Sequence, residues 1–302
     1  MGQSEMYKAL VALSIGDAAG ENVMKILPPK APGYYKAGNV ADERSFPATD
    51  TIQWPWTDDT STAIVVYRHL RKYGTIRQVE LAKELAINAK LDPQRGYGKG
   101  TARLLYTYLY DAENWREHSE NWWGPKQGSK GNGSAMHDTI IGPFFERDYN
   151  RIRTEARASA EVTHFHSDAI AGSIAVAIAA SAATYGDLDY FWNDVIFWMP
   201  NGEMKTRIQT VAAMESETNW KVVGAVGNGK DVTALDTVPF ALWQSFQALG
   251  KAMSFEQTIN SIIEVGGDTD TVGAIVGGII GNKITPPQEW IDITEPLPKD
   301  IV

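Results

Sequence analysis

The stretch that decides the fold lies near the C-terminus, GGDTDTVGAIVGGIIG at residues 266–281. Its second part, from Val272 to Gly281, is apolar and rich in small residues, which predicts a helix packed closely against its neighbours. Its first part places Asp268 and Asp270 at the mouth of that helix. Because residues two apart do not share a helix face, the two carboxylates should converge from a non-helical turn, for which the two preceding glycines supply backbone freedom.

A second acidic cluster, WTDDTST at residues 56–62, stands in a similar position far upstream. It precedes an apolar helix predicted from Ala63 to Tyr73, which Gly74 should end. Asp58 and Asp59 diverge on a regular helix, but at a helix mouth they can reach two ions. Four carboxylates in one buried pocket repel one another unless cations neutralise them, and oxygen ligands suit hard divalent cations. We therefore expect one or two metal ions, although each cluster alone could be an N-cap in a solvated turn.

Composition narrows the class of protein. The 302 residues are 43% hydrophobic and 22% charged, which is typical of a soluble globular protein, and no linker-like stretch divides residues 1–302 into two domains. A net charge of −9 without a basic run argues against nucleic acid or an anionic membrane as partner. The absence of cysteine excludes disulfides, zinc–thiolate sites and thiol catalysis. The start of the chain lacks a signal-peptide pattern, and the longest apolar stretch, 169–183, is shorter than a membrane span. We expect a cytoplasmic monomer.

Helical spacing recurs from end to end and strand patterns are few, so an all-α fold is predicted. The small residues from Gly16 to Gly20 should permit another backbone to approach closely. Residues 28–55 lack periodicity, which is typical of a lid or binding loop. Residues 113–130 also look irregular. Their tryptophans, Trp115, Trp122 and Trp123, are expected to anchor the core rather than to form an aromatic wall for a base.

A glycine-rich loop, QGSKGNGSAMH at residues 127–137, exposes backbone N–H groups at a helix start, which suits a phosphate. By itself such a loop is a weak signal. His164 and His166 form a His-x-His pair that could bind a metal. Because the acidic clusters already offer ligands, we expect the pair to cap a helix and line a pocket.

Taken in order, these motifs resemble the ADP-ribosylglycohydrolase family, which includes dinitrogenase reductase-activating glycohydrolases and the J1 crystallins. The resemblance spans nearly the whole chain, and it implies a compact orthogonal helical bundle with two Mg²⁺ or Mn²⁺ ions in a central cleft. The segments that carry it are Gly16–Gly20, Trp56–Thr60, Arg95–Gly98, Gly131–Met136, Thr163–His164 and Gly266–Thr271.

The resemblance also implies roles for individual residues. The matches to the family's metal ligands are Thr57, Asp58, Asp59, Asp268, Asp270 and Thr271. The matches to its diphosphate loop are Ser129, Lys130, Gly131 and Asn132. Gly98 and His164 match positions that line the ADP-ribose.

Three departures from the family pattern concern the chemistry. Many members carry a glutamate four residues after the first glycine motif, where this chain has Met24; Glu21 could present a carboxylate from nearly the same helix face. Other members carry a catalytic aspartate near Tyr97 and Gly98, and none stands there. The usual arginine after the glycine-rich loop is His137.

The resemblance implies a metal-dependent hydrolase that releases ADP-ribose from a modified protein, ADP-ribosyl-arginine or a related linkage, or from a small ADP-ribosyl compound. Asp58, Asp59 and Asp270 would be catalytic, with Glu21 or Asp59 as proton acceptor. One alternative is a catalytically degenerate protein that binds ADP-ribose or metal; Met24 favours it, and the complete ligand set opposes it. Another is a metal-dependent hydrolase of a different ribosyl compound or a phosphoester, although a simple nucleoside would not need a diphosphate cradle.

Overall fold

The computed structural model describes residues 2–26 and 54–301, and of residues 23–26 it describes only the backbone. Most of the loop expected at 28–55 therefore lies outside the described residues. The rest is helical, and the described part contains no strand, only isolated bridges between Trp54 and Thr294 and between Gly131 and Thr233. The predicted all-α class is confirmed. The α-helices are α1 (Gln3–Ile26), α2 (Asp58–Tyr73), α3 (Gln78–Leu91), α4 (Lys99–Asp111), α5 (Trp115–Asn121), α6 (Ala135–Asp138), α7 (Ile141–Phe145), α8 (Tyr149–Thr163), α9 (Ser167–Tyr185), α10 (Phe191–Trp198), α11 (Glu203–Ala212), α12 (Asn219–Val226), α13 (Ala234–Gly250), α14 (Phe255–Val265), α15 (Thr269–Ile280) and α16 (Gln288–Ile293), with short 3₁₀ turns at Ala112–Asn114 and Leu188–Tyr190.

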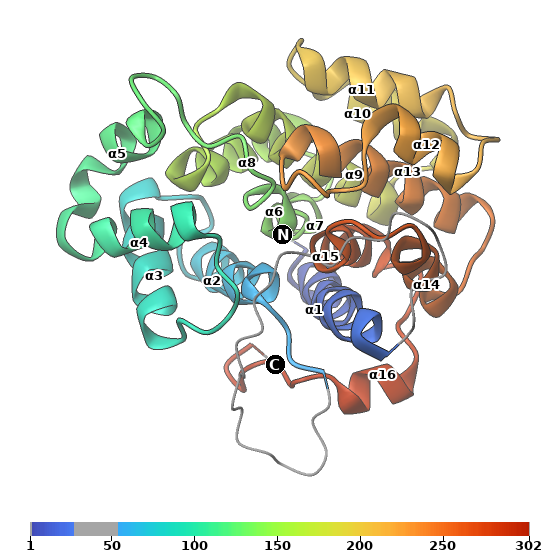
Figure 1. Ribbon diagram of the computed structural model, residues 1–302, viewed down its shortest axis with the longest axis horizontal. Coiled ribbons are helices and arrows are strands. Elements are labelled where there is room, and N and C mark those ends of the chain that lie inside the picture. The colour runs from blue at the N-terminus through green and yellow to red at the C-terminus, as the bar shows by residue number, and fades with distance from the viewer. Residues whose placement is uncertain (1, 27–53, 302) are drawn as a thin grey trace.

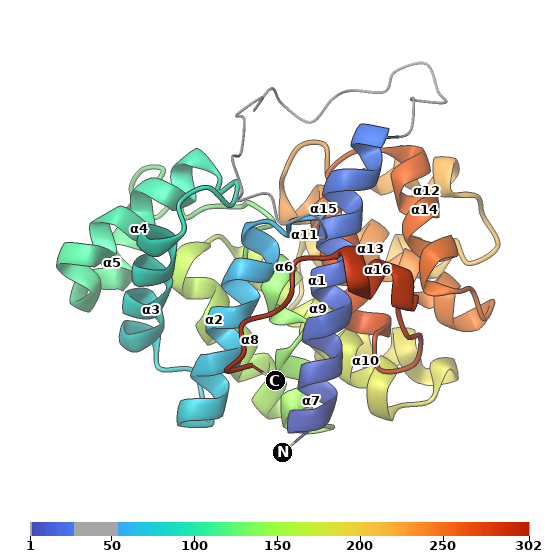
Figure 2. The same ribbon diagram turned by 90° about the horizontal axis from the view of Figure 1, so that it is seen from below.

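Helices α1 and α15 form the centre of the molecule and lie side by side in both views (Figures 1 and 2). Their backbones touch, because a Cβ added at Gly16 would overlap the carbonyl of Gly273, and one added at Gly20 would overlap that of Thr269. The Thr269 hydroxyl also donates to the Gly20 carbonyl at 2.9 Å. The close approach expected at Gly16–Gly20 is therefore confirmed, and it holds the start of α15 against α1.

Two further helices complete the core around this pair. Helix α2 packs against α1, and Gly74 ends it in the left-handed conformation predicted for that residue, with φ 68°. Helix α9 packs against α8, α13 and α15. It is long and apolar enough to cross a membrane, but 83% of its most apolar window is buried inside the fold, which is what a core helix shows.

The segment 113–130, which was expected to be irregular, is partly helical, because α5 lies within it. A helix of seven residues is not stable by itself, so tertiary packing decides: Trp115 in α5 is buried. Helices α3 to α5 make one side of the molecule and α10 to α14 the other, with α6 between them (Figure 1).

Candidate active site

The first acidic cluster forms the opening turn of α2. Thr57 is the N-cap, and its hydroxyl accepts from the Asp59 backbone N–H at 3.3 Å and donates to the Asp59 carboxylate at 2.8 Å. Asp58 and Asp59 lie in the first turn, where carboxylates are favoured by the helix dipole. Thr57 therefore has the capping role that was the plainer alternative for this cluster, while Asp58 and Asp59 line a cleft.

The second cluster is built in the same way at the start of α15. Asp268 is the N-cap, and Asp270 lies in the first helical turn. The expectation that both aspartates sit in a turn ahead of the helix is thus correct for Asp268 and wrong for Asp270, because the helix begins at Thr269. Asn132, from the glycine-rich loop, donates to the Asp268 carboxylate at 2.6 Å. This bond joins the loop directly to the acidic cluster.

Asp17 is a site residue that the sequence did not single out. It is fully buried in α1, and its carboxylate accepts from the backbone N–H groups of Thr57 at 2.9 Å and Thr60 at 3.1 Å, and from the Thr60 hydroxyl at 2.6 Å. Burial and the nearby charge of Asp270 raise the pKa of Asp17 to about 7. Asp17 thus fixes the mouth of α2 to α1. The only signal for it was an aspartate within a run of small residues.

Arg95 holds the same turn from the opposite side. Its guanidinium lies over the Trp56 ring at 3.5 Å, donates to the Trp56 carbonyl at 3.0 Å, and pairs with both carboxylate oxygens of Glu295 at 2.7 Å. Its carbonyl accepts from the Asp58 N–H at 2.8 Å. Residues 56–60 are therefore clamped between α1 and the segment that precedes α4.

The carboxylates of the two clusters disfavour one another's ionised forms. Burial, with the charges of Asp17 and Asp270, raises the pKa of Asp59 well above its ordinary value. Burial, with the charges of Asp268 and Glu21, does the same for Asp270. One oxygen of Asp59, Oδ1, is buried without a hydrogen-bond partner. A site with this much unneutralised negative charge, made only of oxygen donors, is suited to hard divalent cations.

The side chains as they stand do not form a finished coordination sphere. Among the side chains of residues 2–22 and 54–301, no three histidine, aspartate or glutamate groups gather closely enough to hold one metal ion. Other oxygen donors, such as threonine hydroxyls and water, would have to complete the coordination of each ion. The donor chemistry and the unpartnered Asp59 oxygen fit a cation.

The glycine-rich loop runs along the other end of the same cleft. The backbone N–H groups of Ser129, Lys130 and Gly133 make no hydrogen bond to the described part of the chain, so they are available as donors to an anion. The loop is fixed by pairing with the segment before α13: Asn132 N–H donates to the Val232 carbonyl at 3.2 Å. Its shape is therefore set before any ligand arrives.

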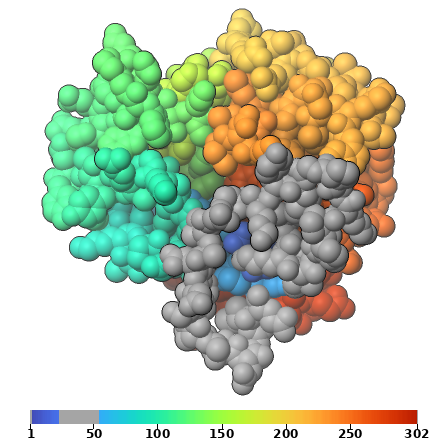
Figure 3. Space-filling view, in the orientation of Figure 1, coloured from blue at the N-terminus to red at the C-terminus, as the bar shows by residue number. Residues whose placement is uncertain are grey.

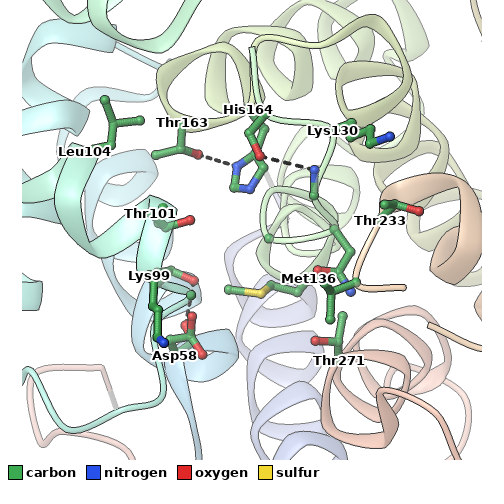
Figure 4. A pocket seen from close by; sticks show the side chains of 18 of the residues that line it. Asp58, Lys99, Thr101, Leu104, Lys130, Met136, Thr163, His164, Thr233 and Thr271 are labelled. Atoms are coloured by element: carbon green, nitrogen blue, oxygen red, sulfur yellow. Dashed lines mark hydrogen bonds between the residues drawn. The ribbon is translucent and has the colours of Figure 1, made fainter. Parts of the chain in front are cut away.

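His164 forms the back of this loop. It is buried, its Nδ1 lies 2.8 Å from the Thr163 hydroxyl (Figure 4), and its ring packs against Gly131 and Gly133, where a Cβ would crowd it. Burial, with a smaller contribution from His137, lowers the pKa of His164 to about 3. His164 is consequently a neutral imidazole near pH 7. His166 caps α9, as expected, by accepting from the Asp168 N–H at 3.2 Å.

The acidic clusters and the loop open into one cleft of about 900 Å³. Its walls come from α4, the segment after α5 and residues 231–233. In Figure 4, Lys99, Thr101 and Leu104 of α4 lie across the cleft from Thr233. In Figure 3, these parts of the chain belong to the teal-to-green and orange surfaces. The predicted site residues that line it are Asp58, Asp59, Gly98, Ser129, Lys130, Gly131, Asn132, His164, Asp268, Asp270 and Thr271, and His137 lines it too.

Two predicted residues do not line the cleft. Thr57 is buried behind Asp59, and Glu21 lies close enough to Asp270 to raise its pKa without forming part of the wall. The side chain of Met24 lies outside the described residues. The expectation that the tryptophans anchor the core is correct for Trp115, which is buried. Trp122 is partly buried and packs against the core while it also lines the cleft. The expectation is wrong for Trp123, which lines the cleft and is 61% exposed.

The protein is all-α, and its cleft joins an acidic cluster to a glycine-rich loop suited to phosphate. Comparison with known proteins identifies its family. The sequence profile of the ADP-ribosylglycohydrolase family matches residues 3–297, so the chain belongs to that family. It is 27% identical to the ADP-ribosylhydrolase ARH3 of Bos taurus over 257 residues, which are 75% of this chain and 69% of that protein. It is 24% identical over 292 residues to an uncharacterized protein of Archaeoglobus fulgidus, covering 96% and 91% of the two chains. A solved structure described as an ADP-ribosylglycohydrolase-related protein complex has the same fold, with a TM-score of 0.66 at 20% identity over 95% of this chain and 91% of that one.

Proposed function

We propose that this protein is a metal-dependent ADP-ribosylhydrolase that cleaves the bond between ADP-ribose and an acceptor group and releases free ADP-ribose. The observation that carries the proposal is that one cleft joins the two acidic helix mouths to the glycine-rich loop. The bond from Asn132 to Asp268 ties these two parts together directly. Membership of the ADP-ribosylglycohydrolase family and the similarity to ARH3 proteins support the reaction class.

The two ends of the cleft would bind different groups. The free N–H groups of Ser129, Lys130 and Gly133 would bind the diphosphate. At the other end, Asp58, Asp59, Asp268, Asp270 and Thr271, supported by Thr57, would hold two Mg²⁺ or Mn²⁺ ions. When bound, such ions would supply charge neutralisation and an acidified water.

The remaining chemistry belongs to the carboxylates. Cleavage of a glycosidic bond passes through an oxocarbenium-like transition state, which negative charge nearby stabilises. Asp59 and Asp270 are buried next to one another's charge and would supply it once bound cations keep them ionised. Glu21 and Asp59 are the candidates for accepting a proton; Glu21 would act from beside Asp270 rather than from the cleft wall.

The group that carries the ADP-ribose would be arginine, serine or a related group, either on a protein or on a small compound.

Two observations support alternative functions. The absence of the family's glutamate, with Met24 in its place, favours a protein that binds ADP-ribose without hydrolysing it. The oxygen-rich acidic end of the cleft would also serve a hydrolase of another ribosyl compound.

Matched aspartate variants test the proposal. Asp270→Asn should abolish release of ADP-ribose from modified protein while leaving the helical circular dichroism unchanged. Asp189→Asn, the same substitution at an exposed position away from the cleft, should leave release unchanged. Retained turnover in Asp270→Asn would remove the acidic cluster from the reaction.

A further inference from the structure

His137 stands where the family resemblance predicts an arginine, and its surroundings are specific. It lies in α6 directly after the glycine-rich loop, is 3% exposed, and lines the cleft. Its Nδ1 lies 2.9 Å from Oδ1 of Asp138. Asp138 is fully buried, and the same oxygen accepts the Ser159 hydroxyl at 2.7 Å. Asp138 is thus held by α8 and in turn holds the imidazole.

This arrangement orients the ring of His137. Asp138 Oδ1 serves as an acceptor for both neighbours, so Nδ1 carries the proton that it donates to Asp138. In a neutral imidazole with Nδ1 protonated, Nε2 keeps its lone pair and acts as an acceptor. His137 lines the cleft and Asp138 does not, from which we infer that the ring edge opposite Asp138, which carries Nε2, faces the cleft. Nε2 makes no hydrogen bond to the described backbone or to the side chains of residues 2–22 and 54–301. The cleft therefore contains a pre-oriented hydrogen-bond acceptor.

A hydrogen-bond acceptor at His137 would bind one part of the ligand, and the N–H donors of the neighbouring glycine-rich loop would bind another. The loop offers N–H donors, which suit phosphate oxygens, whereas Nε2 of His137 would repel those oxygens and needs an O–H or N–H group. His137 lies near enough to His164 to affect its pKa, and His164 packs on Gly131 and Gly133. The acceptor is therefore adjacent to the loop. The donors next to the diphosphate in ADP-ribose are ribose hydroxyls.

We propose that Nε2 of His137 accepts a hydrogen bond from a ribose hydroxyl of ADP-ribose, and that Asp138 and Ser159 position the ring for it. This inference rests on the proposed function, since it assumes that ADP-ribose occupies the cleft. It makes His137 a specificity-determining residue that favours a hydroxyl-bearing sugar over a further phosphate at this position.

A pair of substitutions of similar size tests the acceptor. His137→Gln keeps an oxygen acceptor near the position of Nε2, and His137→Met keeps the volume without it. The affinity for ADP-ribose, measured by calorimetry, should fall about 2- to 12-fold in His137→Met, the range for one lost hydrogen bond, and stay within about twofold in His137→Gln. His118→Gln is the matched control, because His118 forms a similar pair with Asp111 at 2.8 Å outside the cleft; its affinity should not change.

The hypoxanthine analogue of ADP-ribose identifies the donor, because it keeps both riboses and lacks the adenine amino group. The same loss in His137→Met with both ligands supports a hydroxyl donor. A loss that disappears with the analogue would assign the bond to the amino group and overturn the proposal.

Nitrogen NMR of the unaltered protein supplies a test that does not depend on any variant folding. With five histidines in the chain, the His137 ring is assigned by its absence in His137→Gln or, if that variant does not fold, by its coupling to Asp138. The proton should reside on Nδ1, and the Nε2 resonance should move when ADP-ribose binds; a proton on Nε2 would refute the proposal. If the unaltered protein does not bind ADP-ribose, the proposed function falls as well. If it binds, and His137→Met binds equally tightly, only this inference falls.

Discussion

Replacing Asp17 tests how the acidic cluster is built. Its carboxylate is the acceptor for two buried backbone N–H groups, those of Thr57 and Thr60, and for the Thr60 hydroxyl. All three of these bonds reach the same oxygen, Oδ2. Asp17→Ala removes the acceptor for every donor, whereas Asp17→Asn can place its single oxygen where Oδ2 stands and keep the three bonds.

The magnitude follows from the donors left behind. The Thr60 hydroxyl can turn to a backbone carbonyl, but the two N–H groups cannot, and a buried donor without a partner costs about 1–3 kcal/mol. Asp17→Ala should therefore lower the free energy of unfolding by about 2–6 kcal/mol, a large part of the roughly 5–15 kcal/mol that stabilises an ordinary domain. Near pH 4, where the folded-state Asp17 carboxyl is protonated and uncharged like asparagine, Asp17→Asn loses only the weaker contact of Oδ1 with Thr57, at 3.2 Å, and should stay within about 1 kcal/mol of the unaltered protein.

Urea unfolding followed by circular dichroism, with chelator present so that cations do not contribute, measures both differences. Asp17→Ala should also lose hydrolase activity, because the mouth of α2 is no longer fixed. If Asp17→Ala unfolds within about 1 kcal/mol of the unaltered protein, Asp17 does not organise the cluster, and the positioning role given to it is incorrect.

Three further substitution experiments follow from the same structure. Burial and the charge of Asp270 raise the pKa of Asp17 from 3.8 to about 7. With chelator, the unaltered protein should therefore lose stability relative to Asp17→Asn as pH rises from about 4 to about 7, because over that range unfolding releases a proton that the folded state still holds, and the loss should level off above about pH 7; a pH-independent difference would contradict this. Gly273→Ala should destabilise by about 1–3 kcal/mol, since the new Cβ meets the backbone of Gly16 and neither helix can yield locally, and thermal unfolding at an unchanged midpoint would rule out that contact. Trp115→Ala, at a core position, should cost about 3–5 kcal/mol in urea, whereas Trp123→Ala should leave stability nearly unchanged and weaken ADP-ribose binding in a calorimeter; the reverse ranking would be inconsistent with their positions.

Sequence alone predicted the parts of the fold that depend on local pattern. The small residues of α1 and α15 each predicted a close approach to another segment, and the structure shows that the two helices meet at Gly16 and Gly273. Gly74 ends α2 as its type suggests. The meeting of Asp58 and Asp270 in one cleft could be expected because both stand at the mouths of buried helices.

The rest depended on contacts between distant segments. Asp17 gave no periodic signal, because a buried aspartate is recognisable only through its partners, which lie about 40 residues away. Trp122 and Trp123 resemble Trp115 in sequence, and only the path of the chain after α5 turns them to the cleft. The role of His137 likewise required Ser159 and Asp138 to be seen together.

Release of free ADP-ribose from arginine-modified and serine-modified proteins, with Mg²⁺ and with a chelator, tests the central claim most directly. The account predicts release from at least one of the two substrates with Mg²⁺ and its loss with chelator, and the preferred substrate would identify the linkage. Release that persists in chelator would contradict the metal-dependent reaction at the acidic cluster. No release from either substrate, by protein shown to bind ADP-ribose, would contradict the proposed hydrolase and leave a binding protein in its place.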